Sequence, residues 1–360
     1  MKKGLLFMFV IVLAIFTIAG CGEDVVDEVP VDETPDEEAP DEEAPAAEGV
    51  STLGLGVVTT IGRSADYDPD NEIMAMGQVD SVIAAATFDA DGRVVDVMID
   101  TAQVRVRFDE DLQVDTDPAG EFLSKKELGD DYGMRAASPI EREWDEQIAD
   151  LEEWMVGKTV AEIMALDLME DGSPDDPDLV TSVTMTVTSY FAALEKAYQN
   201  AVPVQHDAEM LGLGHNIAIG RSRGLDEAND IMPMAQVDVV ITAAAFGDDG
   251  TVGAVLIDTA QTRVNFDEEG QVTSDRAATY PTKRELGDDY GMRAASPIER
   301  EWDEQIMDLE EWMVGKTVAE ITALDLLDDG APDDPDLVTS VTMTVSYYFD
   351  ALEEAYSLAR

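Results

Sequence analysis

The sequence predicts an α+β fold made of two tandem copies of one domain, each an antiparallel sheet with helices. The string ELGDDYGMRAASPIEREWDEQI at residues 127–148 returns unchanged at residues 285–306, an offset of 158 positions (285 − 127). In each copy, strand-like patterns come first and helix-like patterns follow, which is typical of α+β proteins. A period this long indicates whole domains rather than the short units of a solenoid. We therefore expect one domain at residues 51–201 and the second at residues 209–360.

The front part of each copy has the pattern of a β-hairpin. Residues 78–88 and 93–99 are apolar, β-branched runs that flank an Asp-Gly turn, and residues 248–250 repeat this turn in the second copy. Calcium binding is the alternative function for the turn aspartates, but the further ligands of an EF-hand loop are missing from the sequence. We also expect a second hairpin from residues 103–108 and 112–114.

The back part of each copy has helical periodicity. Residues 138–141 match a capping box with proline at the first helical position, so we expect a helix from there to Gly157. A second capping box at residues 159–162 predicts a shorter helix that ends near Leu168. The first helix has one apolar stripe, formed by Trp144, Ile148, Leu151 and Met155. We expect Trp144 and Trp154 to lie in the core.

Charge and composition exclude several classes of protein. The chain has 22 basic and 79 acidic residues, a net charge of −57, and 45% of its residues are hydrophobic. So acidic a surface repels phosphate, and we expect no nucleic-acid partner. The chain has one cysteine, Cys21, and two unrepeated histidines, His206 and His215, so we predict neither a metal site nor a catalytic Ser–His or Cys–His pair. We expect both histidines to be solvated or loosely packed near a domain start.

The first 21 residues have the features of an export signal. Two lysines precede an apolar run at residues 4–18, which is shorter than the ~20 residues of a membrane-spanning helix. The residues before Cys21 resemble the lipobox of bacterial lipoproteins, which implies cleavage before Cys21 and acylation of the new N-terminus. We therefore expect a lipid-anchored protein on the outer face of the bacterial cytoplasmic membrane. Residues 22–50 are acidic and contain regularly spaced prolines, which predicts a disordered tether.

A second repeated string is DLVTSVTMTV, found at residues 178–187 and again at 336–345. Alone it has the alternation of a strand, but the apolar residues that follow it keep helical spacing. We therefore expect Thr184 in the first turn or two of a helix, with Asp178 or Thr181 as the N-cap. Two roles fit a hydroxyl there. It could donate to a backbone carbonyl within the core, or it could belong to a phosphate site at the helix N-terminus.

Nearly all of each copy resembles the FMN-binding domain of the C subunit of sodium-pumping NADH:quinone oxidoreductase, of Rnf-type subunits and of Gram-positive surface flavoproteins. In that family a flavin transferase esterifies FMN phosphate onto a threonine. The family motif is Asp, two variable residues, Ser or Thr, Gly or Ser, Ala, and the acceptor Thr. Matching residues are Asp178, Thr181, Ser182 and Thr184 in the first copy, and Asp336, Thr339, Ser340 and Thr342 in the second. In both copies serine replaces the usual Gly and valine replaces the usual Ala.

The second landmark of the family is a glycine-containing turn that walls the flavin. The identical segments at residues 127–134 and 285–292 occupy its place. They offer glycines for close backbone approach, an aromatic ring and a thioether, although an ordinary strand-to-helix loop has the same composition. The resemblance implies that these residues contact flavin: Gly129, Tyr132 and Met134, and Gly287, Tyr290 and Met292.

The resemblance implies an electron carrier with two covalently bound FMN groups, one on Thr184 and one on Thr342. Its partners would be the flavin transferase, a membrane redox donor and an extracellular acceptor. We expect an electron-transfer flavoprotein rather than an enzyme with its own substrate, because the chemistry would belong to the cofactor. The alternative is a non-redox surface lipoprotein that binds a ligand or a protein partner through flavin-free domains.

Overall fold

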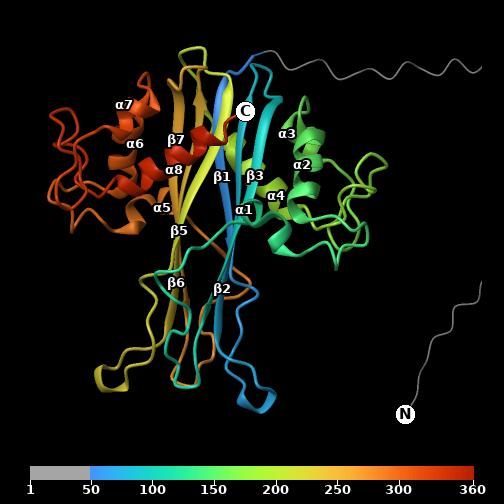
Figure 1. Ribbon diagram of the computed structural model, residues 1–360, viewed down its shortest axis with the longest axis vertical. Helices are drawn as coiled ribbons and strands as arrows, with labels where there is room; N and C mark the ends of the chain where they lie inside the picture. The colour runs from blue at the N-terminus through green and yellow to red at the C-terminus, as the bar shows by residue number, and fades with distance from the viewer. Residues whose placement is uncertain (1–48) are drawn as a thin grey trace, which may run out of the picture. The chain divides into compact units, whose positions relative to one another are not determined.

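Two antiparallel sheets form the centre of the fold (Figure 1). In the first sheet the order is β3-β2-β1, and the short strands β4 and β8 also pair with β1. In the second sheet the order is β5-β6-β7. The strands of the first sheet are β1 (Thr52–Thr60), β2 (Met76–Phe88), β3 (Val94–Arg107), β4 (Val202–Pro203) and β8 (Thr279–Tyr280). Those of the second are β5 (Met210–Ala218), β6 (Met234–Phe246) and β7 (Val252–Asn265).

Helices complete each half of the chain, where the first half is residues 51–201 and the second half is residues 209–360. The first half contains α1 (Lys125–Leu128), α2 (Trp144–Met155), α3 (Val160–Met164) and α4 (Thr188–Gln199), with 3₁₀ turns η1 (Pro69–Asn71) and η2 (Gly129–Tyr132). The second contains α5 (Lys283–Leu286), α6 (Trp302–Met313), α7 (Val318–Thr322) and α8 (Ser346–Ser357), with η3 (Glu227–Asn229) and η4 (Gly287–Tyr290). The predicted α+β class is confirmed.

The structure is a computed structural model that describes residues 49–360. The predicted signal peptide, the acylated Cys21 and the tether up to residue 48 lie outside the described residues. Within residues 49–360, none of the helices has the length and apolar character needed to cross a membrane.

The central strands are apolar on both faces because each sheet packs against helices on one side and against the other sheet on the other. On β2, Val79 and Ile83 point into a cluster shared by both sheets, whereas Val82 and Phe88 point toward α2, α3 and α4. The second half repeats this arrangement with α6, α7 and α8 (Figure 1). The layers therefore run helices, sheet, sheet, helices.

The two halves exchange equivalent hydrogen bonds across their interface. Tyr67 N donates to Gly270 O at 3.0 Å, and Leu225 N donates to Leu112 O at 3.0 Å. Residues 67 and 225, like residues 112 and 270, are 158 positions apart (225 − 67 and 270 − 112). Each half therefore presents the same surface to the other, as subunits do in a two-fold homodimer interface.

The repeated LGLG string allows a helix to lie directly on the first strand of each half. A Cβ atom added at Gly54 would overlap the carbonyl oxygen of Ala197, and one added at Gly56 would overlap that of Ala193. Both carbonyls belong to α4, and α8 meets Gly212 and Gly214 in the same way. Only glycine permits this approach of helix backbone to strand backbone.

The hairpin of β2 and β3 forms as predicted, and the predicted second hairpin is present in a shorter form. Residues 103–107 are the end of β3, a bridge joins Phe108 to Val114, and Asp115 N donates to Arg107 O at 2.9 Å. Strand β2 pairs with β3 all the way to its start at Met76. The long partner strand β2 therefore extends β3 to Arg107, and the expected turn follows at residues 109–112, where Leu112 N donates to Asp109 O.

The prediction of a helix start at residues 138–141 is wrong. Helix α2 begins at Trp144 with Glu143 as its N-cap, and Glu146 completes that capping box. Glu141 has a φ of 55°, which is incompatible with a right-handed helix. The carboxylate of Glu143 also accepts hydrogen bonds from Met134 N (2.7 Å) and Arg135 N (2.9 Å), so it fastens the preceding loop to the helix. The capping box at Thr159 is confirmed, although α3 ends at Met164 instead of near Leu168.

The placement of Thr184 inside a helix is also wrong. Helix α4 begins only at Thr188, and residues 177–182 form consecutive turns. The helix does not begin earlier because Val187 N donates to Gly172 O at 2.9 Å. This hydrogen bond holds the loop before α4 against the turn at Gly172. Neither Asp178 nor Thr181 caps α4, because both lie exposed in the turns, several residues before it.

His215 is buried, contrary to the prediction. Its side chain is 5% exposed and lies between Asp100 of the first half and Glu354 of the second. Burial by itself lowers the pKa of this imidazole, but the two carboxylates outweigh burial and raise the pKa to about 11. His206 is exposed, as predicted.

Candidate functional site

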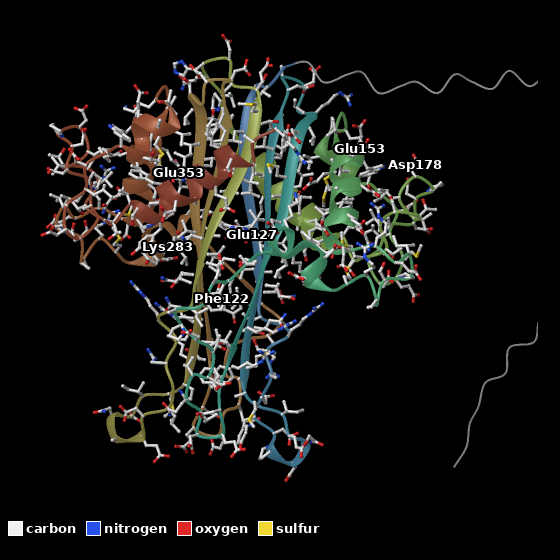
Figure 2. The ribbon with its side chains drawn as sticks, viewed as in Figure 1. Phe122, Glu127, Glu153, Asp178, Lys283 and Glu353 are labelled. Carbon is white, nitrogen blue, oxygen red and sulfur yellow. The ribbon has the colours of Figure 1, made fainter. Side chains whose placement is uncertain are left out.

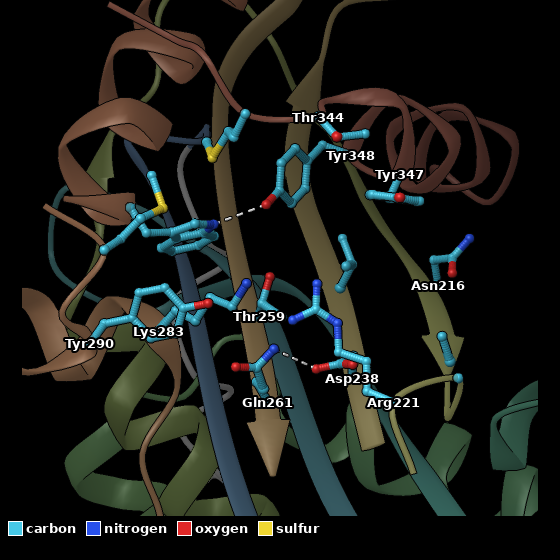
Figure 3. Close-up of a pocket in the computed structure, with 16 residues that line it drawn as sticks. Asn216, Arg221, Asp238, Thr259, Gln261, Lys283, Tyr290, Thr344, Tyr347 and Tyr348 are labelled. Atoms are coloured by element: carbon cyan, nitrogen blue, oxygen red, sulfur yellow. Dashed lines mark hydrogen bonds between the residues drawn. The ribbon is translucent and has the colours of Figure 1, made fainter. Parts of the chain in front are cut away.

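A cavity of about 380 Å³ lies in the second half, beside the loop that contains Thr342. This volume falls within the range of small-molecule sites, which is roughly 300–1,000 Å³. Met343 and Thr344, the two residues after Thr342, form part of its wall. The rest of the wall comes from β5, β6, β7, α5, α6, α8 and the loops after β5 and η4 (Figure 3).

The loop is held in place from α6. Gln305 Oε1 accepts a hydrogen bond from Thr342 N at 2.9 Å and lies 3.4 Å from Thr342 Oγ1. Thr344 Oγ1 donates to Asp329 O at 2.7 Å. Thr342 is half-buried and is not itself part of the cavity wall. The hydroxyl of Thr342 therefore lies one residue away from the cavity, on a loop whose backbone is fixed.

One wall of the cavity is aromatic and carries a lysine. Lys283 Nζ lies 5.0 Å from the centre of the Tyr290 ring and 5.4 Å from that of Trp302. Trp302 Nε1 donates to the hydroxyl of Tyr348 at 2.9 Å, which fixes the indole plane. Met292 and Met343 add thioethers, and Tyr347 is half exposed beside the cavity. Flat rings and soft sulfur atoms suit the face of a planar aromatic ligand.

Another part of the wall is polar. Asp238 accepts hydrogen bonds from Gln236 Nε2 (3.0 and 3.1 Å) and from Gln261 Nε2 (2.8 Å). Arg221 projects into the same space (Figure 3). Thr259 Oγ1 is buried and has no hydrogen-bond partner among the residues that the structure describes. An unpartnered buried hydroxyl in a cavity wall is a position that a polar ligand atom can satisfy.

The electrostatics of the cavity differ from those of the surface. Desolvation lowers the pKa of Lys283 to about 8, and the nearby Arg221 cation adds to this effect. Two cations, Lys283 and Arg221, thus share the cavity with one carboxylate, Asp238. In a chain of net charge −57, this small cavity is locally favourable for a ligand that carries negative charge.

The first half has a cavity of about 390 Å³ at the equivalent corner. Five of its lining residues correspond to lining residues of the second cavity, namely Arg63, Gln103, Lys125, Tyr132 and Met134. Lys125 Nζ lies 4.9 Å from the centre of the Tyr132 ring, and Gln147 Oε1 accepts from Thr184 N at 2.9 Å. The two sites differ where the second half has Asn216, Ala218 and Tyr347, because the first half has Val58, Thr60 and Ser189.

The structure brings together only some of the residues that the sequence singled out. Tyr290, Met292 and the segment after Thr342 meet at the cavity. Gly287 and Gly129 have φ values of 50° and 47° and begin the 3₁₀ turns that carry the tyrosines. The remaining motif residues do not reach the cavity: Asp178, Asp336, Thr181 and Thr339 are exposed, while Ser182 and Ser340 donate to the carbonyls of Leu179 and Leu337. Figure 2 shows Asp178 at the outer edge of its half.

Sequence reasoning missed the cations and the glutamines of the site. Lys283 precedes the identical segment by two residues, and Lys125 stands at the same position in the first half. Gln305 lies inside that segment, but the sequence pattern assigned it no role. A signal for Gln305 and Trp302 was present, because both are unchanged between the halves while much of the surface differs.

Comparison with known proteins gives one partial similarity. The chain is 31% identical to the chlorophenol reductase of Desulfitobacterium hafniense over 115 residues, which is 29% of this chain and 35% of that protein. The similarity thus covers about a third of the length of that relative. No family model matches the chain, and no solved structure matches it.

Proposed function

We propose that the protein is a lipid-anchored, extracytoplasmic electron carrier with two FMN groups, attached by phosphoester bonds to Thr184 and Thr342. The observation that carries the proposal is the cavity of the second half, whose wall continues directly from Thr342 through Met343 and Thr344. A phosphate on the threonine would stand at the edge of a space suited to a planar ring. The similarity to a protein named as a reductase also favours a redox function.

The residues of the cavity fit an FMN group. Bound FMN would supply one-electron and two-electron transfer. The rings of Tyr290 and Trp302 and the thioether of Met292 would pack against the flavin face. Lys283 and Arg221 would offset the negative charge that the ring gains on reduction. Thr259 Oγ1, which lacks a partner within the described part of the chain, would meet a polar ring atom.

Gln305 and Gln147 would position the acceptor threonines. Each side-chain oxygen accepts from the backbone N–H of its threonine at 2.9 Å. That bond does not involve the hydroxyl hydrogen, so it persists after the hydroxyl is esterified. We therefore assign these glutamines a positioning role at both sites. Partners of the mature protein would be a membrane redox donor and an extracellular acceptor, after maturation by a flavin transferase.

The test is the fluorescence of flavin on a denaturing gel of protein produced together with a flavin transferase. Each of Thr184→Ala and Thr342→Ala should remove about half of the signal, and the double variant should remove all of it, because one hydroxyl accepts one FMN. Thr186→Ala is the matched control, since this neighbouring hydroxyl donates to Asp171 O and its removal should leave the signal intact.

A protein that carries no fluorescent flavin when the transferase is active would contradict the proposal. It would favour the alternative of a lipoprotein that binds a ligand or partner through flavin-free domains. Loss of signal in the Thr186→Ala variant would instead show that FMN is attached to Thr186 rather than to Thr184.

A further inference from the structure

The interface between the two halves is not the same on its two sides. Several equivalent positions differ in charge, among them His215, Glu354 and Arg360 in place of Val57, Lys196 and Val202. The exchange of Arg360 for Val202 coincides with an open space. Val202 borders a cavity of about 690 Å³ that lies against β7, α5 and α6, away from the cavity beside Thr342. This volume falls within the range of small-molecule sites, roughly 300–1,000 Å³.

In the first half the equivalent place is occupied by Arg360. Its Nη2 donates to the carbonyl oxygen of Val97 at 2.7 Å and to Glu152 Oε2 at 2.8 Å. The other oxygen of Glu152, Oε1, pairs with Lys126 Nζ at 2.5 Å. The side chain of Glu152 is only 3% exposed. Each oxygen of this buried carboxylate therefore has its own cation.

Glu310 is the equivalent of Glu152, and only one of its oxygens is paired. Oε1 pairs with Arg284 and accepts from Ile257 N at 2.6 Å. Within residues 49–360, no hydrogen bond or ion pair reaches Oε2. Glu310 as a whole is 9% exposed, and it lines the cavity. The second half thus has a carboxylate that lacks its second cation, at the wall of an open cavity.

The missing cation is explained by the residue that replaces the arginine. Val202 has only methyl groups beyond Cβ, so it is too short to take the place of a guanidinium and has no donor to offer. The neighbouring Arg284 does not exclude a further cation from the cavity. In the first half Lys126 lies at the same position, and Glu152 still binds Arg360 as well.

The rest of the wall suits a cation on an apolar stem. Met307 and Val314 supply apolar surface. Ala254 stands where the first half has Asp96, which lies 3.3 Å from the guanidinium of the arginine there. Glu311 supplies a second carboxylate to the cavity instead. A ligand with a positive end and a short alkyl chain therefore finds both a carboxylate and an apolar surface.

We propose that this cavity binds a small alkylguanidinium ion, which donates to Glu310 Oε2 and packs its alkyl chain against Met307. A guanidinium has several N–H donors in one plane, so it can bind a carboxylate and a backbone carbonyl together. Arg360 does so with the carbonyl of Val97, and the equivalent Val255 lies in the wall of the cavity. The ligand supplies the second cation that the first half carries within its own chain. The proposal does not depend on flavin.

The test is titration with n-propylguanidinium, which is an arginine side chain without its backbone, at about 0.5 M NaCl. Exposed carboxylates are largely screened at this salt concentration, and buried ones are screened much less. The pH is about 8, because the pKa of Glu310 is raised to about 7 and the carboxylate must be ionised. Binding is followed by the methyl NMR signal of Met307, whose equivalent in the first half is Ala149. This signal therefore reports on the second half.

The methyl signal of the wild-type protein should shift along a saturable curve. Glu310→Gln should weaken binding at least tenfold, because the amide has no charge to pair with the guanidinium. Val202→Arg installs the residue of the equivalent place, so its own guanidinium should fill the cavity and abolish the response. Glu152→Gln is the matched control and should bind as the wild type does, since its cavity is already occupied by Arg360.

Circular dichroism checks that each variant is folded, and either Glu310→Gln or Val202→Arg suffices if the other is not. A Met307 signal that does not respond to n-propylguanidinium in the wild-type protein would overturn the proposal. Binding of equal strength by the wild type and by folded Glu310→Gln or Val202→Arg would also overturn it. That second result would assign the response to exposed carboxylates such as Glu311.

Discussion

Replacement of Glu310 by glutamine should stabilise the protein at alkaline pH and not at acid pH. Glu310 lies on α6 with a side chain that is 11% exposed, and its Oε1 accepts from Ile257 N and from the guanidinium of Arg284. Burial raises the pKa of this carboxyl from 4.5 to about 7, although Arg284 opposes the shift. The folded protein therefore keeps a proton on Glu310 that the unfolded chain has already lost.

The magnitude follows from that difference in pKa. A factor of ten in a protonation equilibrium is worth about 1.4 kcal/mol, so ionisation of Glu310 in the folded state costs about 3 kcal/mol. The contribution of the protonated Glu310 side chain to the free energy of unfolding is fully present below pH 4.5. It is lost as the pH rises through about 7. Glutamine keeps an oxygen for Ile257 N but has no charge to lose. The variant should therefore gain up to about 3 kcal/mol over the wild type between pH 4.5 and 8.

The assay is urea unfolding of wild type and Glu310→Gln across this pH range. The first half supplies the matched control, because Glu152 accepts from Ile99 N and pairs with two cations, Lys126 and Arg360. Glu152→Gln should show no such gain at alkaline pH. A difference between Glu310→Gln and wild type that stays constant across the range would refute the reasoning, as would an equal gain in Glu152→Gln.

Two further changes test the packing and the cavity. Gly214→Ala should lower the free energy of unfolding by about 3 kcal/mol, because its Cβ would overlap the carbonyl oxygen of Ala351; Gly220→Ala, which meets no atom within 4 Å, should change it little in the same urea titration. Free FMN should quench the fluorescence of Trp302 less strongly as the pH rises through about 8, because Lys283 then loses its charge. In the Lys283→Met variant, FMN should quench this fluorescence only weakly at every pH. A pH dependence of the quenching that remains in the variant would show that another group causes it.

The strands could be predicted from the sequence because their determinants are local. The Asp-Gly turn and the apolar runs on either side of it lie within about twenty residues, and β2 and β3 form there. The first residues of the helices could not be predicted from the sequence, because contacts with distant residues determine where each helix begins. Val187 N donates to Gly172 O, and the carboxylate of Glu143 is used by the loop at Met134. No local pattern distinguishes these residues from ordinary caps.

The candidate site was predictable only in part, for a similar reason. Tyr290 and Met292 lie in an identical repeated segment and were found. Arg221, Asp238 and Lys283 come from three separate segments, and only the packed sheets bring them to one cavity. His215 was missed because its equivalent is Val57, so a search for what the halves share passes over it. A comparison of the two halves identifies residues that both halves contain, whereas His215 occurs in the second half alone.

The reciprocal hydrogen bonds between Tyr67 and Gly270 and between Leu225 and Leu112 have a consequence for how this protein can evolve. In a homodimer with such an interface, any mutation appears at both symmetric places at once. Joining the two partners in one polypeptide removes that constraint. One place can then hold histidine and glutamate while its counterpart holds valine and lysine. A single gene can thus specialise the two sides of one interface independently, which an assembly of identical subunits cannot do.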